Sequence, residues 1–512
     1  MYASAAEGLQ RSWWSGAGHI KETAQKQIHA QKGREKTMEI TREPKLEEKQ
    51  KIQIRLPEKV KQILDGLEAH GYEAYAVGGC IRDSLLGRTP TDWDITTSAL
   101  PAQVKDLFPR TVDTGLVHGT VTVMIGKDGF EVTTYRIDGE YTDGRHPKEV
   151  IFTPSLLEDL QRRDFTINAM AYRERGGLVD AFDGAEDLAA GRIRCVGNPL
   201  DRFGEDALRI LRAVRFAAQL DFQIEAQTQE AIRTLAADLR RISAERIQTE
   251  LVKLAVSPHP EYMRKLYALG ISKIILPEFD RMMETGQNHP HHSLSVGEHT
   301  IAAMQHTPPD KVLRLAMLFH DIAKPLCKTT DQDGTDHFHG HPAQSAAVAE
   351  KVLRRLKFDR ATMDAVCALV YWHDYNPKLT RGKVRRAIVT CGKEQFPAIF
   401  AVKRADILAQ SDYQRAEKLA YVEDYEKLYN AVIKEGDCIS LKQLAVHGRD
   451  ILALGICEGR QVGEILHMLL ELVMEDPDKN EYGYLMQKAR DYLQADVKPE
   501  NSFVPPVETL GS

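Results

Sequence analysis

The sequence predicts an α/β head with a mixed sheet, followed by all-α neck, body and tail regions. Strand and helix signals alternate from about Leu56 to Tyr172. From about Arg202 onward, apolar residues recur at the three- and four-residue spacing of helices, and prolines separate the later helices. A chain of 512 residues is long enough for several domains rather than one core.

The composition indicates a soluble globular protein without an overall bias toward nucleic acid. Apolar residues make up 43% and charged residues 28% of the chain, and the net charge is -6. Contacts with nucleic acid must therefore come from local basic patches. The seven cysteines form no CxxC pair, so we predict reduced thiols in a cytoplasmic protein. No apolar run approaches the length that crosses a membrane.

The chain divides into five predicted regions. Residues 1–50 lack an apolar signal core and are predicted to be a disordered extension, with Met38 as the functional start and a weak transit peptide as the alternative. The predicted regions that follow are a head over 51–175, a helical neck and body over 176–285, a histidine-rich domain over 286–410 and a helical tail over 411–512.

Local patterns predict the elements of the head. LPEKVKQILDGLEAHG reads as an amphipathic helix that ends at Gly71, and YEAYAVGG as a strand that enters a turn. TVTVMIGKDGFEVTTYRI predicts a hairpin around Lys127-Asp128-Gly129. DFTINAMAYR is predicted to be another short strand.

Two aspartates, Asp92 and Asp94, follow a Gly-rich turn in VGGCIRDSLLGRTPTDWDITTS. On an extended strand, residues two apart point to the same face, so the two carboxylates should meet. Like charges this close repel unless a cation lies between them, and Mg²⁺ prefers oxygen ligands beside substrate phosphates. We therefore predict catalytic magnesium ligands at Asp92 and Asp94, with Glu131 on the hairpin as a third carboxylate. A DxD triplet alone would favour an ordinary polar strand edge.

The residues before the aspartates favour a nucleotide site. Gly78 and Gly79 allow backbone N–H groups to approach a triphosphate closely, and Arg82 adds a fork of donors. Two metal ions at the carboxylates would activate an attacking hydroxyl and stabilise a leaving pyrophosphate. The glycine pair, the arginine and the two aspartates follow one another within a single short segment.

GGCIRDSLLGRTPTDWDITTS resembles the head signature of the class II tRNA nucleotidyltransferase and bacterial poly(A) polymerase superfamily. Three later segments are similar to further motifs of that family, in the same order: RIDGEYTDGRHPKEVIFTPSLLEDLQRRDFTINAMAY, EDALRILRAVRFAAQL and SAERIQTEL. The resemblance covers roughly Leu56 to Leu254. It implies a nucleotidyltransferase palm in the head and template-independent transfer of nucleotides to an RNA end.

Asp206 and Arg209 are candidates for choosing the incoming base. They are three apart on a predicted helix, so they share a face, and they supply an acceptor and a donor for a Watson–Crick edge. The resemblance implies the same role. Arg212 and Arg215 continue the stripe as predicted triphosphate or base contacts, and the resemblance adds Arg163. The alternative is an exposed helix face with weak salt bridges.

The predicted product is CCA at the 3′ end of tRNA, made from CTP and ATP with release of pyrophosphate. VDTGLVHGTVTV is similar to the CCA-adding branch, and the chain lacks the GRRF-like segment of the poly(A) branch. GRDILALGICEGRQVGEILHMLLELVME resembles the tail of CCA-adding enzymes. The alternatives are a poly(A) polymerase, an enzyme that adds only CC or only A depending on residues 138–158, and a non-catalytic RNA-binding protein.

An ordered series of histidines and aspartates predicts a second metal site. Adjacent His320 and Asp321 end an apolar helix, and imidazole with carboxylate suits a divalent metal. The spacing resembles the HD phosphohydrolase superfamily, which implies His299, His320, Asp321 and Asp406 as ligands of a metal of unknown identity. Lys324 is a predicted phosphate contact, and His341 and His373 are candidates for a second metal or the substrate. The implied activity is metal-dependent hydrolysis of a phosphate ester on RNA, with an inactive domain as the alternative.

Overall fold

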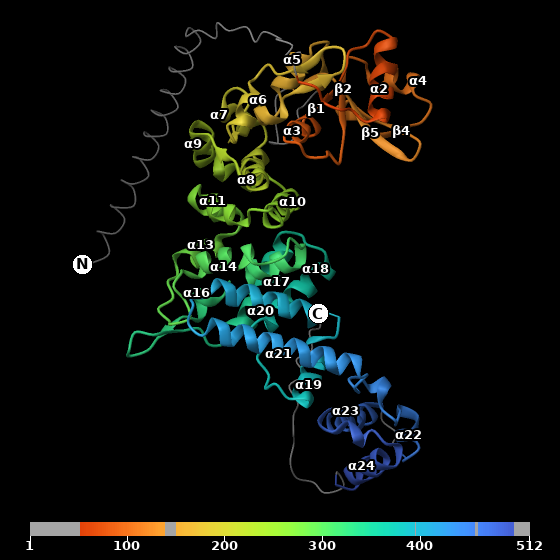
Figure 1. Cartoon of the computed structure of the whole chain (residues 1–512), viewed down its shortest axis with the longest axis vertical. Coiled ribbons are helices and arrows are strands. Elements are labelled where there is room, and N and C mark those ends of the chain that lie inside the picture. The colour runs from red at the N-terminus through yellow and green to blue at the C-terminus, as the bar shows by residue number, and fades with distance from the viewer. Residues whose placement is uncertain (1–51, 139–149, 395, 456–458, 496–512) are drawn as a thin grey trace, which may run out of the picture.

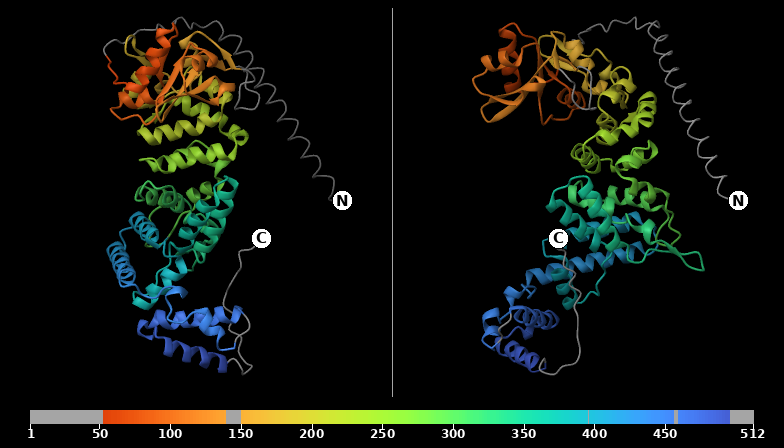
Figure 2. Two further views of the ribbon diagram at one scale, coloured as in Figure 1. Left: turned by 90° about the vertical axis from the view of Figure 1, so that its right-hand side faces the viewer. Right: turned by 180° about the vertical axis from the view of Figure 1, so that it is seen from behind.

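The computed structural model describes residues 52–138, 150–394, 396–455 and 459–495. Figure 1 shows an elongated molecule, with the sheet of the head at one end and the helices α22–α24 at the other. The two further views in Figure 2 show the same order of parts along the long axis. The predictions for residues 1–50 and for most of the 138–158 loop lie outside the described residues.

The head is built on a mixed seven-stranded sheet, which confirms the predicted fold class. Strands β2 and β5 pair in parallel, and the other neighbours in the sheet are antiparallel. Across the sheet the order is β3 (Thr111–Gly115), β4 (Thr120–Ile125), β5 (Asp128–Thr134), β2 (Asp94–Thr97), β1 (Ala74–Val77), β8 (Ala171–Arg173) and β9 (Gly177–Val179).

Strand β1 is buried on both faces because helices cover the sheet on both sides. Ala74 and Ala76 belong to a core with helix α2 (Glu58–Ala69) and helix α4 (Pro101–Leu107). Tyr75 and Val77 belong to a separate core with α5 (Leu156–Gln161). The alternation along one strand thus divides the head into two apolar layers. The short helix α3 (Gly79–Leu85) follows β1 directly.

The local predictions for the head hold with small corrections. The predicted amphipathic helix is α2, whose Val60, Ile63, Leu64 and Leu67 are buried. The hairpin turn lies one step earlier than predicted, because Ile125 already pairs with Asp128 and Gly126 takes a positive φ of 69°. In DFTINAMAYR, a 3₁₀ turn over Thr166–Asn168 precedes the short strand β8.

Outside the seven-stranded sheet, the described chain is mostly helical and contains three two-stranded pairings. These pairings are β6 (Arg136–Asp138) with β7 (Val150–Phe152), β10 (Arg192–Ile193) with β11 (Gln223–Ile224), and β12 (Thr329–Thr330) with β13 (Asp336–His337). The helices that position the two candidate sites are α7 (Pro199–Glu205), α8 (Leu208–Leu220), α10 (Ala244–Ala255), α14 (Val296–Gln305), α15 (Lys311–Phe319), α17 (His341–Arg355), α18 (Arg360–Trp372), α20 (Phe396–Ala409) and α21 (Arg415–Lys434).

One apolar core joins the neck to the histidine-rich region, and the tail has its own core. The first core runs from Phe165 to Val432 and includes α21. The second begins at Cys438 and holds α22 (Gly448–Leu452), α23 (Gly459–Glu475) and α24 (Tyr482–Ala495). The six cysteines within the described ranges are free thiols. Among the described residues, no helix combines the length and the hydropathy needed to cross a membrane.

Candidate functional sites

A cavity of about 520 Å³ lies where the head meets the first neck helices. Its lining includes every residue that the sequence predicted to contact the nucleotide, together with two of the three predicted catalytic carboxylates: Gly79, Arg82, Arg163, Asp206, Arg209, Arg212, Arg215, Asp92 and Asp94. Glu131 does not belong to the lining. Residues from positions 78 to 246 therefore converge on one place.

The carboxylates of Asp92 and Asp94 both face this cavity, although Asp92 precedes strand β2 and only Asp94 belongs to it. Burial raises the pKa of Asp94, the charge of Arg163 opposes that shift, and Asp92 adds to it. Burial and the charges of Asp94 and Asp92 also raise the pKa of Glu131 on β5. The carboxylate oxygens of Asp92, Asp94 and Glu131 do not all lie within 4.8 Å of one another. The concentrated negative charge nevertheless favours a divalent cation.

Gly78 permits the close approach of Arg163 to the turn before α3. Its φ is +83°, a conformation that glycine adopts readily, and a Cβ at this position would lie 3.0 Å from Nη1 of Arg163. The guanidinium is oriented by Asp159, whose Oδ2 lies 3.4 Å from Nη2 of Arg163. Asp159 is fully buried, and Arg162 donates to its other oxygen at 2.8 and 2.9 Å. Sequence analysis missed this anchoring role of Asp159.

The prediction that Asp206 and Arg209 share one helix is wrong for Asp206. Asp206 ends α7, and its Oδ1 accepts a hydrogen bond from the Leu208 backbone N–H at 3.0 Å, at the start of α8. Arg209 lies within α8 and donates to the Arg162 carbonyl at 3.0 Å. Both side chains still line the cavity. Arg246, which the sequence did not identify, contacts the Asp206 carboxylate through both terminal nitrogens.

Arg212 and Arg215 are held by buried carboxylates rather than standing free on a helix face. Nη2 of Arg212 lies 2.6 Å from Asp164, and Nε of Arg215 lies 2.5 Å from Glu250. Burial would raise the pKa of Asp164, but Arg212 and hydrogen bonds lower it to about 2. Both arginines also lie over the ring of Phe216, at 5.3 and 3.8 Å from its centroid. The two ion-paired guanidinium groups thus form one charged wall of the cavity.

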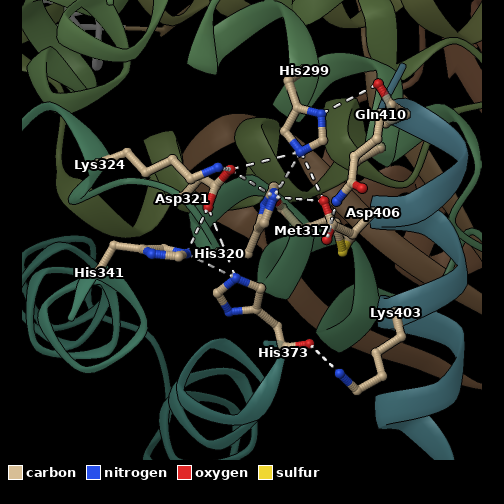
Figure 3. A network of polar contacts seen from close by, with 12 residues as sticks. His299, Met317, His320, Asp321, Lys324, His341, His373, Lys403, Asp406 and Gln410 are labelled. Carbon is tan, nitrogen blue, oxygen red and sulfur yellow. Dashed lines mark hydrogen bonds and ion pairs between the residues drawn. The ribbon is translucent and has the colours of Figure 1, made fainter. Parts of the chain in front are cut away.

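A second cavity, of about 730 Å³, lies among the helices of the histidine-rich region. Figure 3 shows His299, His320, Asp321, His341, His373 and Asp406 pointing toward one another. Of these, Asp321, His341, His373 and Asp406 line the cavity, and His299 and His320 lie behind the lining. His299 comes from α14, His320 and Asp321 follow α15, His341 begins α17, His373 follows α18 and Asp406 belongs to α20. The four predicted ligands therefore meet, and the two additional histidines join them.

Each imidazole is oriented by a carbonyl behind it. The Nδ1 atoms of His320, His341 and His373 lie 2.7, 2.9 and 2.7 Å from the carbonyl oxygen three residues earlier. The Nδ1 atom of His299 lies 3.3 Å from the Ala409 carbonyl. Because a carbonyl only accepts, each Nδ1 carries a proton, and a neutral ring would present the lone pair of Nε2 to a metal ion. In the structure itself, Nε2 of His299 faces the Asp406 carboxylate at 2.8 Å, which requires a proton on that nitrogen as well. This is the usual outer contact of a metal-binding histidine.

Asp321 stands between two groups of possible ligands. One group is His299, His320 and Asp321, and the other is Asp321, His341 and His373; within each, the ligand atoms lie within 4.8 Å of one another. Oδ2 of Asp321 is 3.2 Å from Nε2 of His320, and Oδ1 is 3.3 Å from Nε2 of His341. Nζ of Lys324 forms an ion pair with Oδ2 at 2.7 Å.

The buried charges in this site depend on one another. Burial would raise the pKa of Asp321, but the charges of His320 and Lys324 hold it well below its ordinary value. Burial would also raise the pKa of Asp406, and the hydrogen bonds of His299 and His320 lower it instead. Two ionised carboxylates beside four imidazoles are the ligand types that fit divalent cations. Lys324 and Lys403 also line the cavity, which suits an anionic ligand.

Three family models match successive parts of the chain. The poly(A) polymerase head domain matches residues 74–194, the probable RNA- and SrmB-binding site of polymerase A matches 221–283, and the HD domain matches 291–419. CCA-adding enzymes of Lactiplantibacillus plantarum and Lactobacillus helveticus are 54% identical over 200 residues and 47% identical over 232 residues. The chain belongs to the class II tRNA nucleotidyltransferase and bacterial poly(A) polymerase superfamily.

The likeness to curated members of this superfamily is partial, whereas a solved structure matches most of the fold. The matched residues are 39% and 45% of this chain, and the chain spans about half the length of these curated relatives, 49% and 58%. The Bacillus stearothermophilus CCA-adding enzyme in complex with CTP is 29% identical, with a TM-score of 0.66. That match covers 85% of this chain and 98% of the other.

The superfamily assignment relates the two cavities to two kinds of domain. The nucleotidyltransferase head match contains Asp92, Asp94, Glu131 and Arg163, and the HD match contains all six residues of the second site. Asp206 lies between the matched segments. Nucleotidyltransferase heads and HD domains generally use divalent metals, in agreement with the ligand groups found in the second cavity.

Proposed function

We propose that this protein adds CCA to the 3′ end of tRNA, using CTP and ATP and releasing pyrophosphate. The observation that carries the proposal is that Asp92 and Asp94 share one cavity with Asp206 and Arg209. Paired carboxylates beside a base-reading pair are what template-independent nucleotide transfer requires. The names of the curated relatives and the CTP complex of the B. stearothermophilus enzyme support the same activity.

The proposed roles of the head residues follow from their chemistry. Asp92 and Asp94 hold Mg²⁺, which supplies activation of the RNA 3′-hydroxyl and charge neutralisation at the departing pyrophosphate. Gly79 and Arg82 approach the triphosphate, and Arg163 donates to it from the turn. Glu131 adds negative charge beside the metal ligands from the neighbouring strand. No covalent intermediate with the protein is needed, because the ribose hydroxyl attacks the α-phosphate directly.

Base selection is proposed for Asp206 and Arg209. A carboxylate only accepts hydrogen bonds and a guanidinium only donates them. Cytosine and adenine both present an amino donor next to a ring-nitrogen acceptor, so one pair of side chains suits both bases. Guanine and uracil present a carbonyl acceptor next to an N–H donor, the reverse order. Arg212 and Arg215 are proposed to support the nucleotide through the charged wall above Phe216.

The direct test uses purified protein and tRNA that ends before CCA, with each nucleoside triphosphate alone and with all four together. Ordered addition of C, C and A is the expected result. A long adenosine tail would assign the protein to poly(A) synthesis, and addition stopping after CC or requiring a CC end would assign a partial activity. Binding to tRNA should weaken as salt rises, since phosphate contacts release counterions.

We also propose that the HD cavity hydrolyses a phosphate ester on RNA, such as a 2′,3′-cyclic or terminal phosphate. Divalent cations would be held by His299, His320, Asp321 and Asp406, with His341 and His373 as further ligands, and would supply an activated water and polarisation of the phosphate. The supporting observation is that both oxygens of Asp321 lie close to imidazole nitrogens, Oδ2 at 3.2 Å from His320 and Oδ1 at 3.3 Å from His341. Lys324 is the proposed phosphate contact.

A further inference from the structure

The carboxylate of Asp206 is held by a two-point contact from Arg246 on α10. Nη1 of Arg246 donates to Oδ1 at 3.2 Å, and Nη2 donates to Oδ2 at 2.6 Å. The Leu208 backbone N–H donates to Oδ1 at 3.0 Å. The side chains of Asp206 and Arg246 are 16% and 22% exposed, and both residues line the head cavity. The contact therefore belongs to the wall that a bound base would meet.

A count of lone pairs shows how Arg246 limits what Asp206 can accept. The two oxygens of a carboxylate offer about four acceptor positions. Oδ1 already accepts from Leu208 and Arg246, and Oδ2 accepts from Arg246. The acceptor position that remains for a ligand is on Oδ2. A rigid fork from Arg246 also prevents the carboxylate from rotating to present both oxygens.

We propose that Arg246 sets nucleotide specificity by leaving Asp206 one acceptor for the exocyclic amino group of cytosine or adenine. This inference rests on the proposed function of the head. Guanine presents two adjacent donors, N1–H and the 2-amino group, which a carboxylate binds best with both oxygens. With Arg246 in place, guanine cannot pair its two donors with both oxygens of Asp206.

Removal of the fork should admit guanine in particular. Without Arg246, Asp206 is free to turn both oxygens toward N1–H and the 2-amino group, and Arg209 is suited to the O6 acceptor. Uracil has a single N–H between two carbonyls, so it gains less. Arg246 does not read the base itself, and so it is a positioning residue that acts through Asp206.

The test is single-nucleotide kinetics on tRNA that ends before CCA, with wild-type protein, Arg246→Ala and Arg246→Lys. In Arg246→Ala, kcat/KM for GTP relative to CTP should rise roughly tenfold, the worth of about one hydrogen bond. The ratio for UTP should change much less. Lysine keeps the charge but contacts at one point, so Arg246→Lys should recover CTP use while the relative use of GTP stays raised.

A structural role alone predicts a different pattern. If both variants lost activity with all four nucleotides by the same factor, with the ratios unchanged, the inference would be wrong. If Arg246→Ala is too unstable to assay, kcat/KM for GTP relative to CTP in Arg246→Lys tests the inference instead. Arg264→Ala is the matched control, because Arg264 forms a comparable fork with Glu298 away from the cavity. A wild-type protein that adds no cytidine would overturn the proposed function separately, and the ratio of GTP to ATP would then test Arg246.

Discussion

The Nε2 atoms of His341 and His373 lie 3.3 Å apart, and both side chains are buried. Each ring directs its Nδ1 at a backbone carbonyl, of Phe338 in one case and of Val370 in the other. The two Nε2 atoms consequently bring lone pairs together at the wall of the second cavity. Oδ1 of Asp321, at 3.3 and 3.8 Å from them, adds a negative charge. A cation held by these three groups would relieve the repulsion.

Metal content tests this arrangement directly. Wild-type protein equilibrated with Mn²⁺ and then passed through a desalting column should keep about two ions per chain in the HD cavity. His373→Ala should keep about one, because His299, His320 and Asp406 remain with Asp321. Elemental analysis of the protein fraction gives the count, measured with Asp94→Asn in the background to exclude head-bound metal.

The control for the metal count is His306→Ala, since His306 is exposed at the end of α14 and lies outside the cavity. It should retain the wild-type number of ions. An unchanged count in His373→Ala would contradict the second ligand group, whatever the effect on hydrolysis.

Nucleotide addition and phosphate-ester hydrolysis should be lost independently of each other. Asp94→Asn removes a proposed magnesium ligand of the head, so nucleotide addition should fall by roughly 10²–10³-fold. Its hydrolysis of a 2′,3′-cyclic phosphate should stay at the wild-type level. His320→Ala should lose hydrolysis and keep nucleotide addition at the wild-type level. Loss of both activities in either variant, with a normal thermal midpoint, would argue against separate sites.

Asp164 should stabilise the fold above mildly acidic pH. Its folded pKa is about 2, below the ordinary value of 3.8. A lowered pKa stabilises the folded state fully above the unfolded value, and that contribution disappears as pH falls through about 4 to 2. Asp164→Asn should therefore cost roughly 2 kcal/mol at neutral pH, and its thermal midpoint should approach that of the wild type as the pH falls toward 3.

A matched control of opposite sign is available for this stability measurement. Asp280 is as buried as Asp164, but burial raises its pKa. A raised carboxyl pKa favours the folded state at low pH and loses that contribution as pH rises through the folded value. Relative to wild type, Asp280→Asn should therefore gain stability as pH rises from 3 to 7. The same trend in both variants would show that the Asp164 pair with Arg212 is not responsible.

Sequence patterns were sufficient where structure is local. The buried Val60, Ile63, Leu64 and Leu67 of α2 follow the helical period directly. His299, His320, Asp321 and Asp406 also lie together, but that set came from the resemblance to the HD superfamily, since His299 and Asp406 are 107 residues apart. The helix face was predictable from local pattern because it depends only on neighbouring residues.

Contacts between distant segments could not be predicted in the same way. Apolar spacing continues from α7 into α8, so nothing in the period marks the break at Asp206. The one local signal was Asp206 itself, because aspartate is a preferred capping residue at the start of a helix. The Arg246 fork and the Arg215 pair with Glu250 join segments 40 and 35 residues apart. Such pairs depend on how whole helices pack, which a single sequence does not record.

Substitution of Asp206 should change the choice of nucleotide rather than the use of metal. Asp206→Ala removes the acceptor for the amino group of cytosine and adenine, so kcat/KM for CTP and ATP should fall by roughly 10- to 100-fold. GTP and UTP, which do not depend on that acceptor, should lose much less. The Mg²⁺ concentration for half-maximal activity should stay the same, because Asp92 and Asp94 are intact.

The control is Asp201→Ala, which changes an exposed aspartate in the first turn of α7 and should behave as wild type. Unchanged discrimination among the four nucleotides in Asp206→Ala would remove the base-reading role, and a raised Mg²⁺ requirement would reassign Asp206 to the metal site.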